Sequence, residues 1–123
     1  MIGFYEKKEL SFEIKGAFAI YKNKEIFWGE SQHRLLIALI AERSINAAAK
    51  KCNMSYQQAW TIADRLNRLS PIPILIKHKG GKDGGGCLVS AYGKELIRLY
   101  ERKTAEFNQY ISSMNMDIDK CLL

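Results

Sequence analysis

Residues 44–69 have the sequence SINAAAKKCNMSYQQAWTIADRLNRL, in which two helical patterns flank a short turn. The first pattern, from Ile45 to Cys52, has alanines at core spacing, and small side chains allow two helices to cross closely. Asn53 occupies the turn, because asparagine adopts a left-handed backbone more readily than most residues. Ser44 and Ser55 precede the two patterns and carry hydroxyl groups suited to capping a helix start. The stretch therefore predicts a helix-turn-helix.

The second helix, expected from Tyr56 to Leu69, has two unlike faces. Apolar residues at helical spacing form its inner face: Ala59, Ile62, Ala63, Leu66 and Leu69. The outer face begins with amide and hydroxyl groups and ends in arginines: Tyr56, Gln57, Gln58, Thr61, Asp64, Arg65 and Arg68. Glutamine pairs with adenine, arginine pairs with guanine or phosphate, and tyrosine and threonine contact phosphates or the thymine methyl group. The pattern favours a helix in the major groove of DNA, and the solvated face of an ordinary three-helix core is the alternative.

A further helix is expected between Glu30 and Glu42, and it would complete the core of residues 30–69. Its apolar stripe consists of Leu35, Leu36, Leu39 and Ile40. We expect Trp60 to pack between the helices, because large aromatic side chains usually close a small core, and contact of its indole with the DNA backbone is the alternative. His33 has no partner at metal-binding spacing and is interpreted as a surface or boundary histidine.

Residues 10–28, before this core, alternate between apolar and polar side chains around the sequence Lys22-Asn23-Lys24. Alternation with a period of two around an asparagine-containing turn is typical of a β-hairpin with one buried face. Gly16 is expected to mark a bulge or bend within it.

Residues 74–89, which follow Pro71 and Pro73, contain two short apolar runs around a loop rich in glycine and lysine. The prolines end the preceding helix, and the runs predict a two-stranded ribbon. The loop lacks the spacing of a Walker motif, which disfavours nucleotide binding. Lys79 and Lys82 can bind phosphates, and the glycines allow the backbone to approach a duplex closely. A ribbon of this kind after a helix-turn-helix is typical of a wing.

Residues 91–114 predict a further helix, with Ser90 as its cap. Its apolar stripe is longer than one small domain can cover. We therefore expect a dimer contact formed by Leu96, Leu99, Tyr100, Phe107, Tyr110, Ile111 and Met114. A helix folded back on its own hairpin is the alternative.

The formal net charge of +6 favours an acidic partner such as nucleic acid, and the excess is concentrated in one part of the chain. Between Arg43 and Lys82 there are eight basic residues and one acidic residue, Asp64. The three cysteines include no C-x-x-C pair, so neither a disulfide framework nor a zinc site is indicated. No apolar run approaches the roughly 20 residues that span a bilayer, and the N-terminus lacks the apolar core of a signal peptide. We expect a soluble cytoplasmic protein with no membrane partner, no metal, no cofactor and no catalytic residues.

Several of these motifs resemble one family. The similarity includes Ser44–Ala49, Met54–Trp60, Leu66–Asn67, the loop Gly80–Gly86 and the pair Tyr92–Gly93. Together these residues resemble the N-terminal DNA-binding domain of the molybdate-dependent ModE regulators, a winged helix related to the LysR type. The similarity covers residues 30 to about 112, and its specific elements are S-Y-x-x-A-W and G-G-x-x-G-G-G. The resemblance implies a recognition helix that begins at Ser55, a wing tip at residues 79–86 and a dimer contact in the last helix.

Two departures from the ModE pattern affect these expectations. Asn53 stands where the family commonly has glycine, which its left-handed tendency tolerates. The oxyanion-binding domains of full-length members have no counterpart in these 123 residues, so we do not expect molybdate to bind this chain.

The resulting prediction is a mostly α protein with small β elements, in which residues 1–123 form a single winged helix-turn-helix domain. An N-terminal β-hairpin and a long C-terminal dimerisation helix complete it. We expect sequence-specific binding of double-stranded DNA as a homodimer, and regulation of transcription. The base-contacting residues would be Tyr56, Gln57, Gln58, Thr61 and Arg65, and the phosphate-contacting residues would be Ser44, Asn46, Ser55, Lys79 and Lys82. A dimeric protein-interaction module on the same scaffold is the alternative.

Overall fold

The computed structural model describes residues 12–78 and 86–122 and is mostly helical. The elements in chain order are β1 (Ile20–Lys22), β2 (Glu25–Trp28), α2 (Glu30–Glu42), α3 (Ile45–Lys51), α4 (Tyr56–Leu69), β3 (Leu75–Lys77), β4 (Cys87–Val89) and α5 (Ala91–Leu122). The strands form two separate antiparallel pairs, β1 with β2 and β3 with β4. Residues 18–100 form one compact unit, and the described residues 12–17 and 101–122 belong to a second. No helix in the described ranges is long and apolar enough to cross a membrane.

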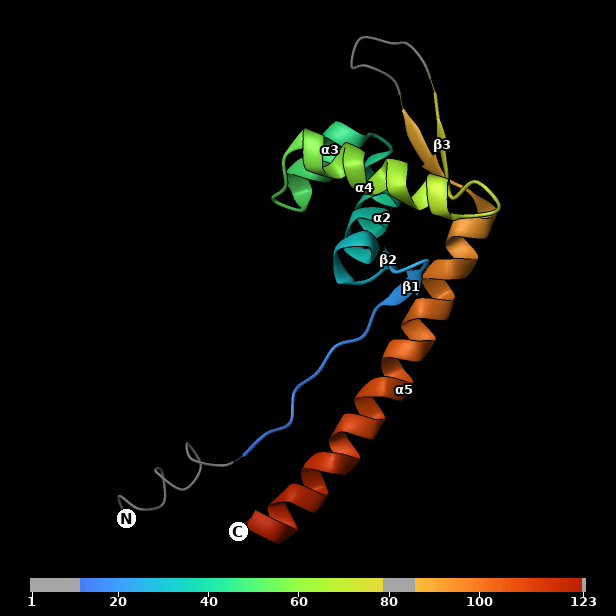
Figure 1. Cartoon of the computed structure of the whole chain (residues 1–123). Helices are drawn as coiled ribbons and strands as arrows, with labels where there is room; N and C mark the ends of the chain where they lie inside the picture. The colour runs from blue at the N-terminus through green and yellow to red at the C-terminus, as the bar shows by residue number, and fades with distance from the viewer. Residues whose placement is uncertain (1–11, 79–85, 123) are drawn as a thin grey trace. The chain divides into compact units, whose positions relative to one another are not determined.

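Helices α3 and α4 are held across their turn by the local chemistry expected from the sequence. The Ser44 hydroxyl accepts the Ala47 N–H at 3.0 Å, and the Ser55 hydroxyl accepts the Gln58 N–H at the same distance, which confirms both caps. Asn53 has a φ of 56°, the left-handed conformation expected of it. Figure 1 shows these two helices in green beside the teal helix α2.

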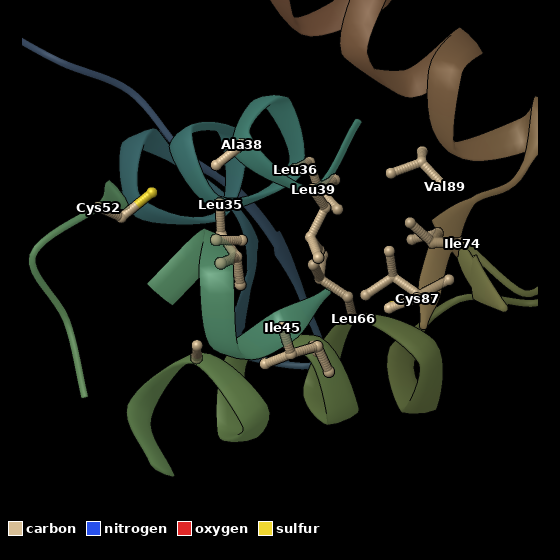
Figure 2. Close-up of a cluster of buried hydrophobic side chains, with 14 of the residues drawn as sticks. Leu35, Leu36, Ala38, Leu39, Ile45, Cys52, Leu66, Ile74, Cys87 and Val89 are labelled. Atoms are coloured by element: carbon tan, nitrogen blue, oxygen red, sulfur yellow. The ribbon is translucent and has the colours of Figure 1, made fainter. Parts of the chain in front are cut away.

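The core of residues 18–100 is built on side chains from α2, α3 and α4 together with the bases of β3 and β4 (Figure 2). Four alanines have no more than 1% of their surface exposed: Ala48, Ala49, Ala59 and Ala63. Their small side chains allow α3 and α4 to cross closely, as the sequence indicated. From α2 the buried side chains are Gln32, Leu35, Leu36, Ala38 and Leu39.

Two expectations about the core are wrong. Trp60 does not pack between the helices, because 40% of its surface is exposed, and Trp28 of β2 is instead the buried tryptophan, with 1% exposed. Trp60 directly follows Ala59 and therefore lies on a different side of α4 from the buried residues Ala59 and Ala63. Ile40 is also exposed, and Ala38 takes its place in the buried stripe of α2.

The first hairpin is shorter than residues 10–28. Within its described part, residues 12–28, strand pairing is confined to Ile20–Lys22 and Glu25–Trp28, and the irregularity in their register lies between Ile20 and Tyr21 rather than at Gly16. Asn23 and Lys24, with φ values of 50° and 70°, form the turn, and two consecutive positive φ angles suit a tight hairpin. Residues 12–19 form no strand, although their side chains alternate.

Within the second unit, the backbone of Ile14 pairs with a helix side chain instead of a strand. Its N–H donates to Oδ1 of Asn115 at 2.6 Å, and Nδ2 of Asn115 donates to the Ile14 carbonyl at 3.2 Å. Gly16 lies beside Phe107 and Ile111 of α5. Alternation alone therefore did not distinguish a paired strand from an extended segment that packs on a helix.

Helix α5 continues to Leu122, beyond the expected end at residue 114. No glycine or proline follows Gly93, so no residue in this stretch interrupts a helix for steric reasons. The expected cap at Ser90 is confirmed, because its hydroxyl accepts the Gly93 N–H at 3.0 Å.

Gly93 fits a position in α5 where a larger residue would collide with β4 and the residue before β3. A Cβ atom placed there would lie 2.8 Å from Cγ1 of Val89 and 2.9 Å from the Ile74 carbonyl oxygen. We expect Gly93→Ala to lower the free energy of unfolding by about 1–3 kcal/mol through overpacking, despite the better helix propensity of alanine. Denaturant unfolding followed by circular dichroism measures this change.

Gly16→Ala is the matched control, because a Cβ atom there would make only ordinary contacts, the nearest at 3.4 Å from Phe107. Equal unfolding curves for Gly93→Ala and the unaltered protein would show that the junction between α5 and the second hairpin is not tightly packed.

Candidate nucleic-acid interface

The N-terminal half of α4 presents polar side chains to solvent. Tyr56, Gln57, Gln58 and Thr61 are exposed, and Arg65 is half-buried. The Thr61 hydroxyl donates to the Gln57 carbonyl oxygen at 2.9 Å, so its proton is used within the helix and its methyl group remains available to a ligand. These polar side chains lie on the helix that follows the capped turn, with the exposed Trp60 among them.

The expected phosphate-contacting residues lie on α3 and at the two caps. Asn46 is exposed on α3, Ser55 is exposed, and Ser44 is half-buried. Both serine oxygens accept backbone N–H groups, which leaves each hydroxyl hydrogen free to donate to a further acceptor.

Near the C-terminal end of α4, the positive charge of Arg68 is paired with a carboxylate. Arg68 donates to both carboxylate oxygens of Glu25 on β2, at 2.8 and 3.2 Å. Hydrogen bonding from Arg68 lowers the pKa of Glu25, and hydrogen bonding to Glu25 raises the pKa of Arg68. Lys51 similarly lies 3.5 Å from Glu42. Part of the basic excess between residues 43 and 82 is therefore neutralised by acids that lie outside that window in the sequence, at positions 25 and 42.

The base of the second hairpin is fixed to two helices. Strands β3 and β4 pair with Lys77 opposite Cys87, and the His78 N–H donates to the Gly86 carbonyl oxygen at 2.8 Å. The Cys87 N–H donates to the carbonyl oxygen of Arg43 at the end of α2, also at 2.8 Å. Lys79 and Lys82, together with most of the expected wing tip, lie outside the described residues.

Asn67 of α4 makes the second attachment of the hairpin, and its role was not predicted from the sequence. Its Oδ1 accepts the N–H groups of Ile74 and Leu75, and its Nδ2 donates to the Leu75 carbonyl oxygen, each at 2.9 Å. An asparagine in the last turn of a helix, just before a proline-containing turn, is the signal that could have indicated it. Asn67 orients β3 relative to α4.

Trp60 and Lys77 make a contact between α4 and β3 that the sequence also did not predict. The Lys77 ammonium lies 4.7 Å from the centroid of the Trp60 ring, within the range of a cation–π interaction. Both side chains are exposed. The contact extends the polar surface of α4 toward the hairpin.

The residues expected at a dimer contact fall into two groups, one in the unit of residues 18–100 and one in the second unit. Tyr100 is 6% exposed and packs within its own unit, with its ring centroid 5.2 Å from that of Phe18 and 4.8 Å from that of His33. Leu96 is partly buried against the same core. His33 is half-buried, in agreement with its interpretation as a boundary residue. In the second unit Tyr110 is 66% exposed. Phe107, Ile111 and Met114 of that unit are half-buried, as are Leu96 and Leu99 of residues 18–100.

The cysteines offer no metal site within the described ranges, where no group of three or more histidine, cysteine or acidic side chains comes together. Cys52 and Cys87 are buried, and burial raises the pKa of the Cys87 thiol although Lys77 acts in the opposite direction. A buried neutral thiol behaves as a small apolar side chain.

Comparison with known proteins gives relatives that are named as ModE proteins or as molybdenum-pterin-binding proteins. The chain is 34% identical over 86 residues to the molybdenum transport protein ModE of Azotobacter vinelandii, which covers 70% of this chain and 32% of that protein. It is 38% identical over 76 residues to the transcriptional regulator ModE of Haemophilus influenzae, covering 62% of this chain and 30% of that protein. It is 33% identical over 78 residues to the DNA-binding transcriptional dual regulator ModE of Escherichia coli K12, covering 63% and 30%.

The chain spans about a third of the length of the curated relatives it matches. No protein-family model matches it. The similarities support a ModE-like, molybdenum-related family for the matched part of the chain.

Asn67→Ala tests the attachment of β3 to α4. The substitution removes three hydrogen bonds and leaves the N–H groups of two buried residues, Ile74 and Leu75, without their acceptor. We expect the free energy of unfolding to fall by at least about 2 kcal/mol, since each buried unsatisfied donor costs about 1–3 kcal/mol. Chemical unfolding measures the loss, and Asn108→Ala at an exposed position of α5 serves as the control. Identical stability of the two variants would contradict the assigned role of Asn67.

Proposed function

We propose that this chain is a winged helix-turn-helix that binds double-stranded DNA in a sequence-specific manner as a homodimer and regulates transcription. The observation that carries the proposal is the solvent-exposed polar surface on the N-terminal half of α4, held by the two capped helix starts. In this assignment α3 and α4 are the helix-turn-helix, α4 is the recognition helix and the β3–β4 hairpin is the wing. The similarity to the named ModE regulators supports the regulatory role.

Base contacts are assigned to the exposed side chains of α4. Gln57 and Gln58 can each pair in bidentate fashion with adenine, and Arg65 can reach guanine or a phosphate. Tyr56 supplies a hydroxyl group, and Thr61 supplies its methyl group for contact with thymine because its hydroxyl is bonded within the helix. These residues give the proposed complex its sequence preference.

Phosphate contacts are assigned to residues on either side of the recognition helix. Ser44, Asn46 and Ser55 lie on the helix-turn-helix, and Lys79 and Lys82 belong to the segment that joins β3 to β4. Such contacts fix the register of a protein on the duplex and carry little sequence information. We expect them to account for most of the salt dependence of binding.

The dimer is assigned to the part of α5 that lies in the second unit. Phe107, Tyr110, Ile111 and Met114 recur at helical spacing; Tyr110 is exposed, and the other three are half-buried, with Phe107 and Ile111 beside Gly16 of their own unit. Tyr100 is left out of this contact because it belongs to the core of residues 18–100. A symmetric dimer would address two half-sites about 34 Å, or a multiple of that distance, apart on a near-palindromic operator.

A dimeric protein-interaction module is the second candidate, and the outer face of α2 favours it. Ile37 and Ile40 are exposed there. A shallow surface pocket of about 290 Å³ adjoins Ile37, lined also by His33, Arg34, Ala38, Ala41, Lys51 and Cys52. Titration of a random duplex at two salt concentrations distinguishes the candidates, because binding that weakens with salt is expected only of the DNA-binding protein.

Gln57→Ala tests the role of α4 in base contacts. We expect a loss of about 1–3 kcal/mol in operator binding, confined to one base position, with the salt dependence unchanged. Fluorescence anisotropy with a labelled operator, obtained by selection from random DNA, measures the loss. Gln109→Ala on exposed α5 is the matched control and should bind as the unaltered protein does. Equal losses on operator and random DNA would argue against base contact by Gln57.

Tyr110→Glu tests the proposed dimer contact. Placing a carboxylate on an apolar contact should shift sedimentation from dimer to monomer and weaken operator binding, whereas the exposed position of Tyr110 should leave the fold intact. Gln109→Glu introduces the same charge on the other side of the helix and should sediment as a dimer. A dimer that persists in Tyr110→Glu would count against this contact.

A further inference from the structure

Trp60 and Lys77 form a pair that joins the proposed recognition helix to the proposed wing. The Lys77 ammonium lies 4.7 Å from the centroid of the Trp60 ring. Trp60 comes from α4 and Lys77 from β3, and both side chains are exposed to solvent. A large aromatic side chain left exposed beside a polar surface calls for a role other than core packing.

The chemistry of this pair suits an anion. An ammonium group and an indole N–H can only donate hydrogen bonds, and neither group can accept one. Among residues 12–78 and 86–122, Lys77 has no acidic partner within ion-pair distance, whereas Lys51 and Arg68 are paired with Glu42 and Glu25. Within these described residues the charge of Lys77 is therefore not neutralised by an acid.

The position of the pair suits a phosphate of the DNA backbone. Tyr56 lies one helical turn before Trp60 on the same side of α4, and its hydroxyl is a further donor. Tyr56, Trp60 and Lys77 thus form a row of donors beside Gln57, the residue proposed to contact a base. Phosphate contacts from lysine and tyrosine commonly flank base contacts in this way.

We infer that Lys77 binds a backbone phosphate of duplex DNA and that Trp60 is the residue that positions it. The inference rests on the proposed function, in which α4 enters the major groove. The lysine side chain has four rotatable bonds, and the ring face restricts them before DNA binds. Less conformational entropy is then lost when the contact to phosphate forms. The ring also connects Lys77 to α4, so the base of the hairpin and the helix approach the duplex together.

Lys77→Gln tests the phosphate contact by fluorescence anisotropy. The two duplexes are the selected operator and a scrambled duplex of equal length, each titrated at several salt concentrations. We expect binding to both to weaken by the same factor, about tenfold, and the slope of log Kd against log salt concentration to fall by about one unit. Lys77→Arg should restore most of the affinity, because arginine keeps the charge and stacks on aromatic rings. Lys120→Gln, an exposed lysine of α5, is the matched control for loss of charge.

Trp60 variants test the positioning role. Trp60→Leu should weaken binding to both duplexes about two- to fivefold, which corresponds to the loss of one exposed cation–π contact. Trp60→Phe, which keeps a ring, should lose less. The double variant Trp60→Leu, Lys77→Gln should bind as weakly as Lys77→Gln alone, because without the cation the ring has nothing to position. Thermal unfolding of each variant should stay near that of the unaltered protein, since both side chains are exposed.

Tryptophan fluorescence gives an independent measurement. Trp28 is buried, with 1% of its surface exposed, so acrylamide quenching of the unaltered protein should come mainly from Trp60. Binding of DNA should protect this component, and Trp60→Phe, which retains only Trp28, should show no change on binding.

The two proposals fail in different ways. If the unaltered protein binds neither duplex, the proposed function fails and this inference fails with it. If it binds DNA but Lys77→Gln leaves the salt slope unchanged, or weakens only the operator, Lys77 is not a phosphate contact. Independent, additive losses from Trp60→Leu and Lys77→Gln, or unchanged quenching on binding, would overturn the positioning role and leave the proposed function standing.

Discussion

The close crossing of α3 and α4 is the constraint on which the rest of residues 18–100 depends. The crossing is possible because alanines occupy the contact, with Ala48 and Ala49 on one helix and Ala59 and Ala63 on the other, all almost fully buried. A larger side chain at any of these positions would separate the helices and tilt the polar surface of α4. Trp60 lies off the buried face of α4, which is formed by Ala59, Ala63, Leu66 and Leu69, and it stays exposed, whereas Trp28 of β2 is buried in the core. The candidate interface therefore follows from a property of the core.

Local chemistry explains why much of the fold could be predicted. The two serine caps and the left-handed Asn53 depend on interactions within a few residues, and the sequence contains both partners. The limits of α2 and α4 follow in the same way from capping and from proline. The start of the first hairpin could not be predicted from the sequence, because residues 12–19 have the alternation of a strand but form no strand. Pairing is a tertiary property, and a period of two only permits it.

The exposure of the polar side chains on α4 could be predicted from the sequence, whereas their electrostatic surroundings could not. The exposed side chains on the first half of α4 include Tyr56, Gln57, Gln58 and Thr61, as the pattern indicated, and also Trp60, which it did not indicate. Whether a charge is free depends on partners distant in sequence, such as Glu25 for Arg68. The attachment of β3 by Asn67 and the contact between Trp60 and Lys77 likewise join separate elements. A one-dimensional pattern contains no information about which of these groups will meet.

The left-handed backbone of Arg43 links the end of α2 to the second hairpin. At a φ of 60° a residue with a side chain is strained by about 1–2 kcal/mol. Its N–H donates to Leu39, and its carbonyl oxygen accepts the Cys87 N–H of β4. Without β4 this carbonyl loses its partner while the strain remains, so the end of the helix is less stable when the hairpin is absent. Helix and hairpin are thus thermodynamically coupled, and the base of the second hairpin should form and melt cooperatively with the helical core rather than as an independent appendage.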